Sequence, residues 1–281
     1  YYGDRKEIGR YNTIATWQSL NVLEKKSKDE HSTEFKEFID GINTVIVDEV
    51  HMAKADVLKR MLTGPFAHCQ IRWGLTGTVP KQEYEYMGIK VGLGEVTNKI
   101  PAKDLQDKGV LANCHVNVLQ TNDVLEFRSY AEELKWLTTD SKRMSWVAQT
   151  ISDIATSGNT LILVDRISAG EILEKKIKDS VFIRGATKNM ERKEHYDEVS
   201  TAQTKVIIAT YGVAAVGINI PRIFNLVLIE PGKSFVRVIQ SIGRGIRKAE
   251  DKDSVNIWDI TSACKFARRH LTQRKKFYKE A

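Results

Sequence analysis

Two adjacent carboxylates and a histidine, Asp48, Glu49 and His51, follow a short run of apolar and β-branched residues, Thr44 to Val47. The run predicts a buried strand, whose two acids need a compensating charge. In an open parallel sheet, ligands bind at the carboxyl ends of the strands. An Asp placed there can hold the Mg²⁺ of a nucleotide, and a Glu can activate the water that attacks the terminal phosphate. The alternative is a strand that ends in a solvated acidic turn.

A second constellation, Gln240-Ser-Ile-Gly-Arg-Gly-Ile-Arg247, lies within residues 235–248, which have helical periodicity. At about 100° per residue, the apolar side chains share one face, and Gln240, Arg244 and Arg247 share the opposite face. Arg grips phosphate in a fixed fork, so this face suits an arginine finger. The alternative is a plain amphipathic helix with exposed arginines. The two glycines argue against it, because each costs a helix about 1 kcal/mol relative to Ala.

The segment Lys205 to Pro221 predicts a buried strand that ends at Thr210, followed by a turn rich in Gly and Ala. Such turns expose backbone N–H groups that can bind phosphate oxygens. Gly217 and Asn219 lie where they could reach a nucleotide. Taken alone, the segment favours an ordinary strand-to-helix turn. Weaker candidates for nucleic-acid contacts follow other predicted strands or open a helix: Thr16, Gln18, Thr76, Thr78 and Gly185.

A phosphate-binding loop of the G-x-x-x-x-G-K-[ST] type is missing from the sequence. Pro231-Gly-Lys-Ser234 resembles the end of such a loop, but Val227 occupies the position of its first glycine. The acids and arginines therefore lack the usual partner for the β- and γ-phosphates within these 281 residues.

The second half of the chain alternates apolar strands with helical segments. Strands are predicted at 160–164, 181–183, 206–209, 225–229 and 255–260, and helices at 168–177, 189–199, 235–248 and in the C-terminal tail. This alternation is typical of a parallel α/β sheet. In the first half, strands are predicted at 44–47, 71–75 and 110–119 and a helix at 53–62, whereas 81–109 has little period. We place the domain junction near 118–140 and expect domains at 1–118 and 119–281.

The bulk composition is that of a water-soluble globular protein, with 42% hydrophobic and 28% charged residues. No apolar run approaches the roughly 18 residues of a membrane span, so we expect no membrane partner. The three cysteines, Cys69, Cys114 and Cys264, are far apart and form no C-x-x-C pair. This argues against a disulfide framework and for a reducing compartment such as the cytoplasm.

The net charge of +7 arises entirely in the second half, and the segment Lys265 to Ala281 is its most basic part. A basic segment of this kind suits a polyanion, with Arg268, Arg269 and Arg274 as candidate contacts. The alternative is a solvated, lysine-rich terminal helix.

Taken in order, these motifs resemble the later motifs of superfamily 2 DExH helicases, in particular the UvsW-type phage helicases that remodel branched DNA. The narrower likeness lies in the turn after Thr210, the arginine helix and Lys103-Asp-Leu-Gln-Asp-Lys-Gly-Val110. The motifs that carry the resemblance are Thr16-Trp-Gln18, Asp48-Glu-Val-His51, Leu75-Thr-Gly-Thr78, Leu161-Ile-Leu-Val164, Gly185 with Arg192, Thr210 to Pro221 and Gln240 to Arg247.

The resemblance implies two RecA-like domains, parallel sheets flanked by helices, with ATP between them. Asp48 would hold Mg²⁺ through water, and Glu49 would be the base. His51 and Gln240 would couple the domains, and Arg244 and Arg247 would reach the γ-phosphate. Gly217 and Asn219 would line the nucleotide site, and the nucleic-acid track would take in Thr16, Gln18, Thr76, Thr78, Gly185 and Thr210.

The family's phosphate-binding loop and adenine-reading Gln lie upstream of the Thr-Trp-Gln motif, yet only fifteen residues precede Thr16. We therefore expect a fragment that holds part of the first domain and all of the second. We predict that such a fragment has no appreciable ATPase activity, while the full-length protein has one that DNA stimulates.

The leading functional hypothesis is an ATP-dependent DNA helicase of replication, recombination or repair. It would act as a monomer on branched or forked DNA in the cytoplasm of the host cell, if it is encoded by a phage. The sequence shows no base-reading pattern, so we expect recognition of DNA structure rather than sequence. A double-strand translocase, an RNA helicase and a non-catalytic nucleic-acid-binding module remain as alternatives.

Overall fold

The computed structural model describes residues 1–3, 6–9, 11–52, 55–77, 79–80, 82–108, 113–187, 189–215, 222–232 and 254–278. The chain divides into two compact units, Tyr1–Lys99 and Ile100–Ala281. The predicted junction near 118–140 is therefore too late in the chain. The reason is that the strand at 113–121 pairs with the last strand of the second unit and belongs to its sheet.

The first unit has two parallel strands, β1 (Thr44–Val47) and β2 (Ile71–Gly74). Its helices are α1 (Trp17–Asp29), α2 (Glu34–Ile39), the 3-10 turn η1 (Val50–Met52), α3 (Ala55–Thr63) and α4 (Glu83–Leu93). Its main buried cluster contains Leu23, Phe35, Phe38, Met61, Phe66 and Cys69. Strand β1 has the predicted bounds, and it ends directly before Asp48.

Burial of β1 differs from the expectation. Val45 packs against the core of the first unit, but Ile46 is 56% exposed. Its register partner on β2, Trp73, is 61% exposed. Paired residues of neighbouring strands point to the same face, so one face of this two-stranded sheet is covered and the other is open. The prediction of a buried strand is therefore wrong for one face of β1.

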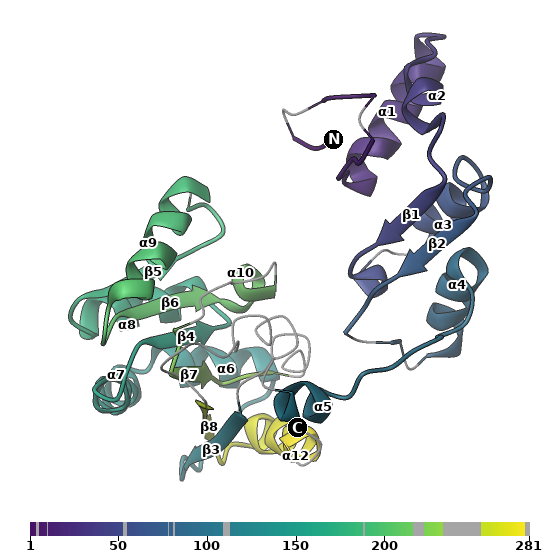
Figure 1. The fold of residues 1–281 in the computed structure, drawn as a ribbon. Coiled ribbons are helices and arrows are strands. Elements are labelled where there is room, and N and C mark those ends of the chain that lie inside the picture. The colour runs from purple at the N-terminus through teal and green to yellow at the C-terminus, as the bar shows by residue number, and fades with distance from the viewer. Residues whose placement is uncertain are drawn as a thin grey trace. The chain divides into compact units, whose positions relative to one another are not determined.

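The second unit is built on six parallel strands in the order β3-β8-β7-β4-β6-β5 (Figure 1). The strands are β3 (Asn113–Thr121), β4 (Thr160–Val164), β5 (Ser180–Ile183), β6 (Val206–Thr210), β7 (Asn225–Ile229) and β8 (Ser254–Ser262). The helices are α5 (Ala102–Asp107), α6 (Tyr130–Thr139), α7 (Ser141–Ala155), α8 (Ile167–Lys176), α9 (Asn189–Thr201), α10 (Tyr211–Ala215) and α12 (Lys265–Tyr278).

Helices cover both faces of this sheet, as Figure 1 shows. Alternate residues of β4 enter two different cores: Ile162 packs with α7 and α8, whereas Leu161 packs with α9 and α10. Every residue of β4 and β7 is buried, which is the pattern of central parallel strands. The predicted α/β architecture is thus confirmed, and each strand predicted in the second half forms within one or two residues of its expected bounds.

Several helices were missed from the sequence, of which α7 and α4 are the longest. Helix α7 buries Met144, Val147, Ile151 and Ile154 on one face, an i, i+3, i+7 spacing that the sequence does contain. Helix α4 lies within 81–109 and carries two glycines, which weakened the helical signal there.

None of the helices in the described part of the chain is both long and apolar enough to cross a membrane.

Candidate functional site

The acidic turn after β1 has an unusual backbone. Glu49 has φ +48°, in the left-handed region that non-glycine residues rarely adopt. The Asp48 carboxylate accepts a hydrogen bond from the Glu49 backbone N–H at 2.9 Å, which holds the turn in this conformation. Strain of this kind, about 1 to 3 kcal/mol, clusters at functional sites. The turn therefore presents two consecutive carboxylates at the carboxyl end of a parallel strand, as the sequence predicted.

His51 connects the acidic turn to the end of the neighbouring strand. Its Nδ1 lies 2.6 Å from the Thr76 hydroxyl and 3.4 Å from a Glu49 carboxylate oxygen. The backbone supports the same link, because the Val50 N–H donates to the Leu75 carbonyl at 3.1 Å. The structure thus brings together three predicted site residues, Glu49, His51 and Thr76.

The side chains of Asp48, Glu49 and His51 are exposed enough to contact a ligand. The Glu49 side chain is 38% exposed, and His51 is 15% exposed. Asp48 is also exposed. Accessible carboxylate oxygens are the ligands that Mg²⁺ prefers, usually one or two together with water and phosphate oxygens. The carboxylates of Asp48 and Glu49 are therefore ligands of the kind that a nucleotide-bound magnesium ion needs.

The start of α1 holds the first two candidates for nucleic-acid contact. The Thr16 hydroxyl accepts the Ser19 backbone N–H at 3.3 Å and caps the helix. Thr16 and Gln18 are both exposed. A structural role for Thr16 is therefore visible, and its surface position leaves contact with a ligand open. Thr78 lies outside the described residues.

Gly185 lies two residues after β5, and Thr210 is the last residue of the neighbouring strand β6. The Arg192 guanidinium donates to the Arg184 and Gly185 carbonyls at 3.0 and 2.7 Å, so the predicted association of Gly185 with Arg192 is present. The Thr210 hydroxyl accepts the Val213 N–H at 3.3 Å at the start of α10. Both residues lie at the carboxyl edge of the sheet, where the sequence placed them.

The remaining nucleotide-site candidates lie outside the described residues. They are Gly217, Asn219, Gln240, Arg244 and Arg247.

The basic tail forms helix α12, and its three candidate arginines divide into two groups. Arg268 and Arg269 are exposed. Arg274 is 2% exposed and pairs with the fully buried Asp259 through its Nε at 2.8 Å and Nη2 at 3.0 Å. The prediction that Arg274 contacts nucleic acid is therefore wrong, because its charge is buried against Asp259 of β8. Periodicity alone could have placed it on the inner face of the helix.

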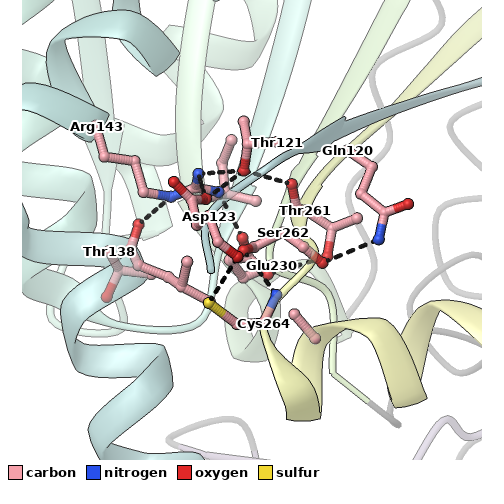
Figure 2. A network of polar contacts seen from close by, with 12 residues as sticks. Gln120, Thr121, Asp123, Thr138, Arg143, Glu230, Thr261, Ser262 and Cys264 are labelled. Atoms are coloured by element: carbon pink, nitrogen blue, oxygen red, sulfur yellow. Dashed lines mark hydrogen bonds and ion pairs between the residues drawn. The ribbon is translucent and has the colours of Figure 1, made fainter. Parts of the chain in front are cut away.

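A buried polar network in the second unit escaped the sequence analysis altogether (Figure 2). Arg143 donates to Asp123 and Glu230, each at 2.7 Å, and to the Thr121 hydroxyl at 2.6 Å. Glu230 also accepts the Thr261 hydroxyl at 3.1 Å. These residues come from four separate segments of the chain, so no local pattern could pair them. The one available signal was an acid, Glu230, directly after the apolar strand 225–229.

Comparisons with known proteins find helicases among the proteins similar to this chain. Residues 142–249 match the family model of the helicase conserved C-terminal domain. The ATP-dependent DNA helicase uvsW of Enterobacteria phage T4 is 23% identical over 253 residues, 86% of this chain and 50% of that protein. Helicase 22 of a Sulfolobus islandicus filamentous virus is 26% identical over 258 residues, 84% of this chain and 45% of that protein. The chain thus spans about half the length of these relatives.

Solved structures share the fold. The crystal structure of T4 UvsW matches with a TM-score of 0.52 and 20% identity, over 87% of this chain and 53% of that one. The helicase MrfA bound to DNA and AMPPNP gives 0.62 and 13%, over 92% and 36%. Dbp5 of S. cerevisiae bound to RNA and ADP BeF3 gives 0.59 and 16%, over 94% and 62%. The fold is therefore that of RecA-like helicase domains, and over most of its length the chain is similar to the T4 helicase UvsW.

Proposed function

We propose that the protein acts as an ATP-dependent DNA helicase or translocase that unwinds or branch-migrates DNA in replication, recombination or repair. The observation that carries this proposal is the acidic turn. Asp48 and Glu49 lie at the carboxyl end of a parallel strand on strained backbone, and His51 ties them to Thr76. The likeness to the T4 DNA helicase supports DNA as the substrate.

The two carboxylates have different tasks in this proposal. Asp48 holds Mg²⁺ through water, and Glu49 accepts the proton of the attacking water. The magnesium ion, when bound with ATP, neutralises charge that develops on the phosphate oxygens. Glu49 suits a base because its carboxylate reaches solvent while His51 limits its orientation.

His51 and Thr76 form the link from the acidic turn to the second strand of the unit. Thr76 sits in the Leu75-Thr-Gly-Thr78 segment, which the family resemblance associates with the nucleic-acid track. A hydrogen bond of 2.6 Å between the two side chains gives a direct route by which a change near Thr76 alters the position of His51. We infer that this contact relates nucleic-acid binding to the hydrolytic residues.

The segment Gln240 to Arg247 supplies the positive charges that the acidic turn lacks. Arg244 and Arg247 stabilise the transferred phosphate, Gln240 takes part in coupling, and Gly217 and Asn219 line the nucleotide site. These roles rest on the resemblance. An arginine finger is worth about 10³ to 10⁵ in turnover, so this part of the proposal predicts a large effect.

Nucleic-acid contacts are assigned to groups at strand ends, at the start of α1 and on α12. In the second unit these are Gly185 and Thr210 at the carboxyl edge of the sheet and the exposed Arg268 and Arg269 on α12. In the first unit they are Thr16, Gln18 and Thr76, together with Thr78, which lies outside the described residues. Contacts of this type are made to the sugar-phosphate backbone of the nucleic acid, and they favour recognition of its structure over its base sequence.

The test is ATP turnover by the full-length protein with forked DNA, linear duplex DNA or RNA. Stimulation that is strongest with forked DNA supports the proposal. Equal stimulation by linear duplex favours a double-strand translocase, and stimulation by RNA alone favours an RNA helicase. Binding without any turnover favours a non-catalytic module.

A further inference from the structure

Three consecutive residues at the exit of β7 are each held by a helix of the second unit. Glu230 accepts a hydrogen bond from Arg143 on α7 at 2.7 Å. The carbonyl of Pro231 accepts one from Arg274 on α12. Gly232 lies against Tyr130 on α6, whose hydroxyl would be 3.0 Å from a Cβ at that position. The chain therefore leaves β7 in contact with three helices, two of which donate hydrogen bonds to it.

Glu230 is the most constrained of the three. Its backbone N–H donates to the Ile260 carbonyl at 3.0 Å, and its second carboxylate oxygen accepts the Thr261 hydroxyl at 3.1 Å. Its φ is +43°, which strains a residue with a side chain. The fold thus holds a glutamate in an unfavourable conformation through hydrogen bonds to α7 and β8; Figure 2 shows its side chain within the polar network.

Arg143 is equally constrained and reaches Glu230 from inside the protein. Its side chain is 4% exposed, and its other donors go to Asp123, Thr121 and the Leu137 carbonyl. Two rigid groups therefore meet in a geometry that neither can leave without breaking several hydrogen bonds.

Stability does not explain this pair. Burial is the largest influence on Glu230 and raises its pKa to about 7, although Arg143 acts in the opposite direction. The ionised pair is thus less favourable in the folded protein than a protonated Glu230 over part of the neutral range. Buried ion pairs of this kind add little stability but can fix one arrangement. The charged or titratable groups around Glu230 are Arg143, Asp123, Arg274, Asp259 and Tyr130, and the ring of His270 contacts that of Tyr130 edge to face.

We propose that Arg143 and Glu230 are positioning residues, whose ion pair fixes where the chain leaves β7 and so where the following residues begin. Those residues include Gln240, Arg244 and Arg247, and the inference rests on their role in the proposed function. Neither member of the pair touches the substrate. Ionised Glu230 is the competent form, because only the charged form holds Arg143 by an ion pair.

The first test is the pH profile of ATP turnover by the full-length protein between pH 6 and 8.5. Wild-type turnover is expected to rise with an inflection near 7. Glu230→Gln keeps the shape and the contact with Thr261 but removes the charge. It should lower turnover about 10- to 100-fold at pH 8, as expected for a small misplacement of reacting groups, and remove the inflection. Arg143→Lys keeps the charge without the fork and should retain the inflection with reduced turnover.

Glu133→Gln is the matched control. Glu133 is also buried, at 1% exposure, and accepts the Phe266 and Ala267 N–H groups at 3.0 and 2.6 Å. It tests the loss of a buried acid in the same unit away from β7. This variant should keep the inflection. An inflection that survives in Glu230→Gln, or vanishes equally in both variants, would overturn the inference.

A second measurement needs no ATP. Hydrogen exchange of the 281-residue chain at pH 8 should be faster in peptides that follow Pro231 in Glu230→Gln than in wild type or Glu133→Gln. Equal exchange in all three proteins contradicts the positioning role. Arg244→Ala separates the two proposals: if it leaves turnover unchanged, the assigned role of the arginine fails, while hydrogen exchange still decides on Glu230.

Discussion

Glu49 and Glu230 occupy similar backbone positions in two different units. Each follows a parallel strand, and each has positive φ, +48° and +43°. Their surroundings differ sharply. The Glu49 side chain is 38% exposed at the surface of the first unit, whereas Glu230 is 5% exposed within the second.

The difference shows how one kind of strand end can serve two purposes. Glu49 keeps a carboxylate that can reach water, with His51 beside it, so it can take part in chemistry. Glu230 gives both carboxylate oxygens to Arg143 and Thr261, so it can only hold the chain in place. Accessibility, rather than residue type or backbone conformation, separates the reactive acid from the positioning acid.

The largest expected change in stability comes from Arg143→Met. It leaves Glu230 and Asp123 without their shared cation, and breaking a buried pair costs about 3 to 5 kcal/mol. The free energy of unfolding in urea measures the change. The control is Arg184→Met, because the pair of Arg184 with Glu171 is 41% and 44% exposed and should contribute less than about 1 kcal/mol. Similar losses in both variants would remove the distinction between buried and exposed pairs.

The next effect is a pH dependence of stability that belongs to Glu230. Its folded-state pKa of about 7 lies above the ordinary value of 4.5, so the folded protein binds the proton more tightly. The associated stability is present below about pH 4.5 and is lost as the pH rises to about 7, by a few kcal/mol at most. The free energy of unfolding of the wild type should therefore fall relative to that of Glu230→Gln as the pH rises from 4.5 to 7. A constant difference between them from pH 4.5 to 7 would contradict the raised pKa.

A smaller effect is expected at the link between the two strands of the first unit. Thr76→Val removes the hydroxyl that contacts His51 and should cost about 0.5 to 1.5 kcal/mol. If the contact between Thr76 and His51 couples DNA binding to Glu49, DNA-stimulated turnover falls in this variant while basal turnover changes less. Thr44→Val, on the exposed side of β1, is the control. Equal stimulation in both variants would limit Thr76 to a structural role.

The smallest change in stability is expected on α12. Arg268→Ala with Arg269→Ala should alter unfolding by less than about 0.5 kcal/mol, because both side chains are exposed. If both arginines contact phosphates, the salt dependence of duplex binding should flatten by roughly 0.9 in slope for each. Arg274→Gln should do the reverse, with lower stability and an unchanged slope, because its charge is buried with Asp259. An unchanged slope in the double variant assigns those charges to the solvated surface.

Much of the fold follows from local patterns in the sequence. The strands 160–164 and 225–229 were predicted with the bounds that the structure has, because continuous apolar runs between polar turns leave little choice. Helix α7 was missed although its periodicity is present. The boundary between the units was misplaced because pairing of β3 with β8 joins residues about 140 positions apart.

The candidate site was predictable only in part, for the same reason. Asp48, Glu49 and His51 are close in sequence, so their motif was visible. The contact of His51 with Thr76, the burial of Arg274 and the pairing of Arg143 with Glu230 all depend on tertiary packing. Sequence patterns indicate which groups can do chemistry, whereas packing decides which of them remain accessible.

The most direct test of the central claim is Glu49→Gln in the full-length protein, measured by DNA-stimulated ATP turnover and by unfolding. A general base contributes about 10² to 10⁴ to a rate, and a half-exposed side chain contributes little to stability. We predict that turnover falls at least about 100-fold while the free energy of unfolding changes by less than about 0.5 kcal/mol. Turnover equal to that of the wild type would contradict the assignment of the acidic turn as the hydrolytic site.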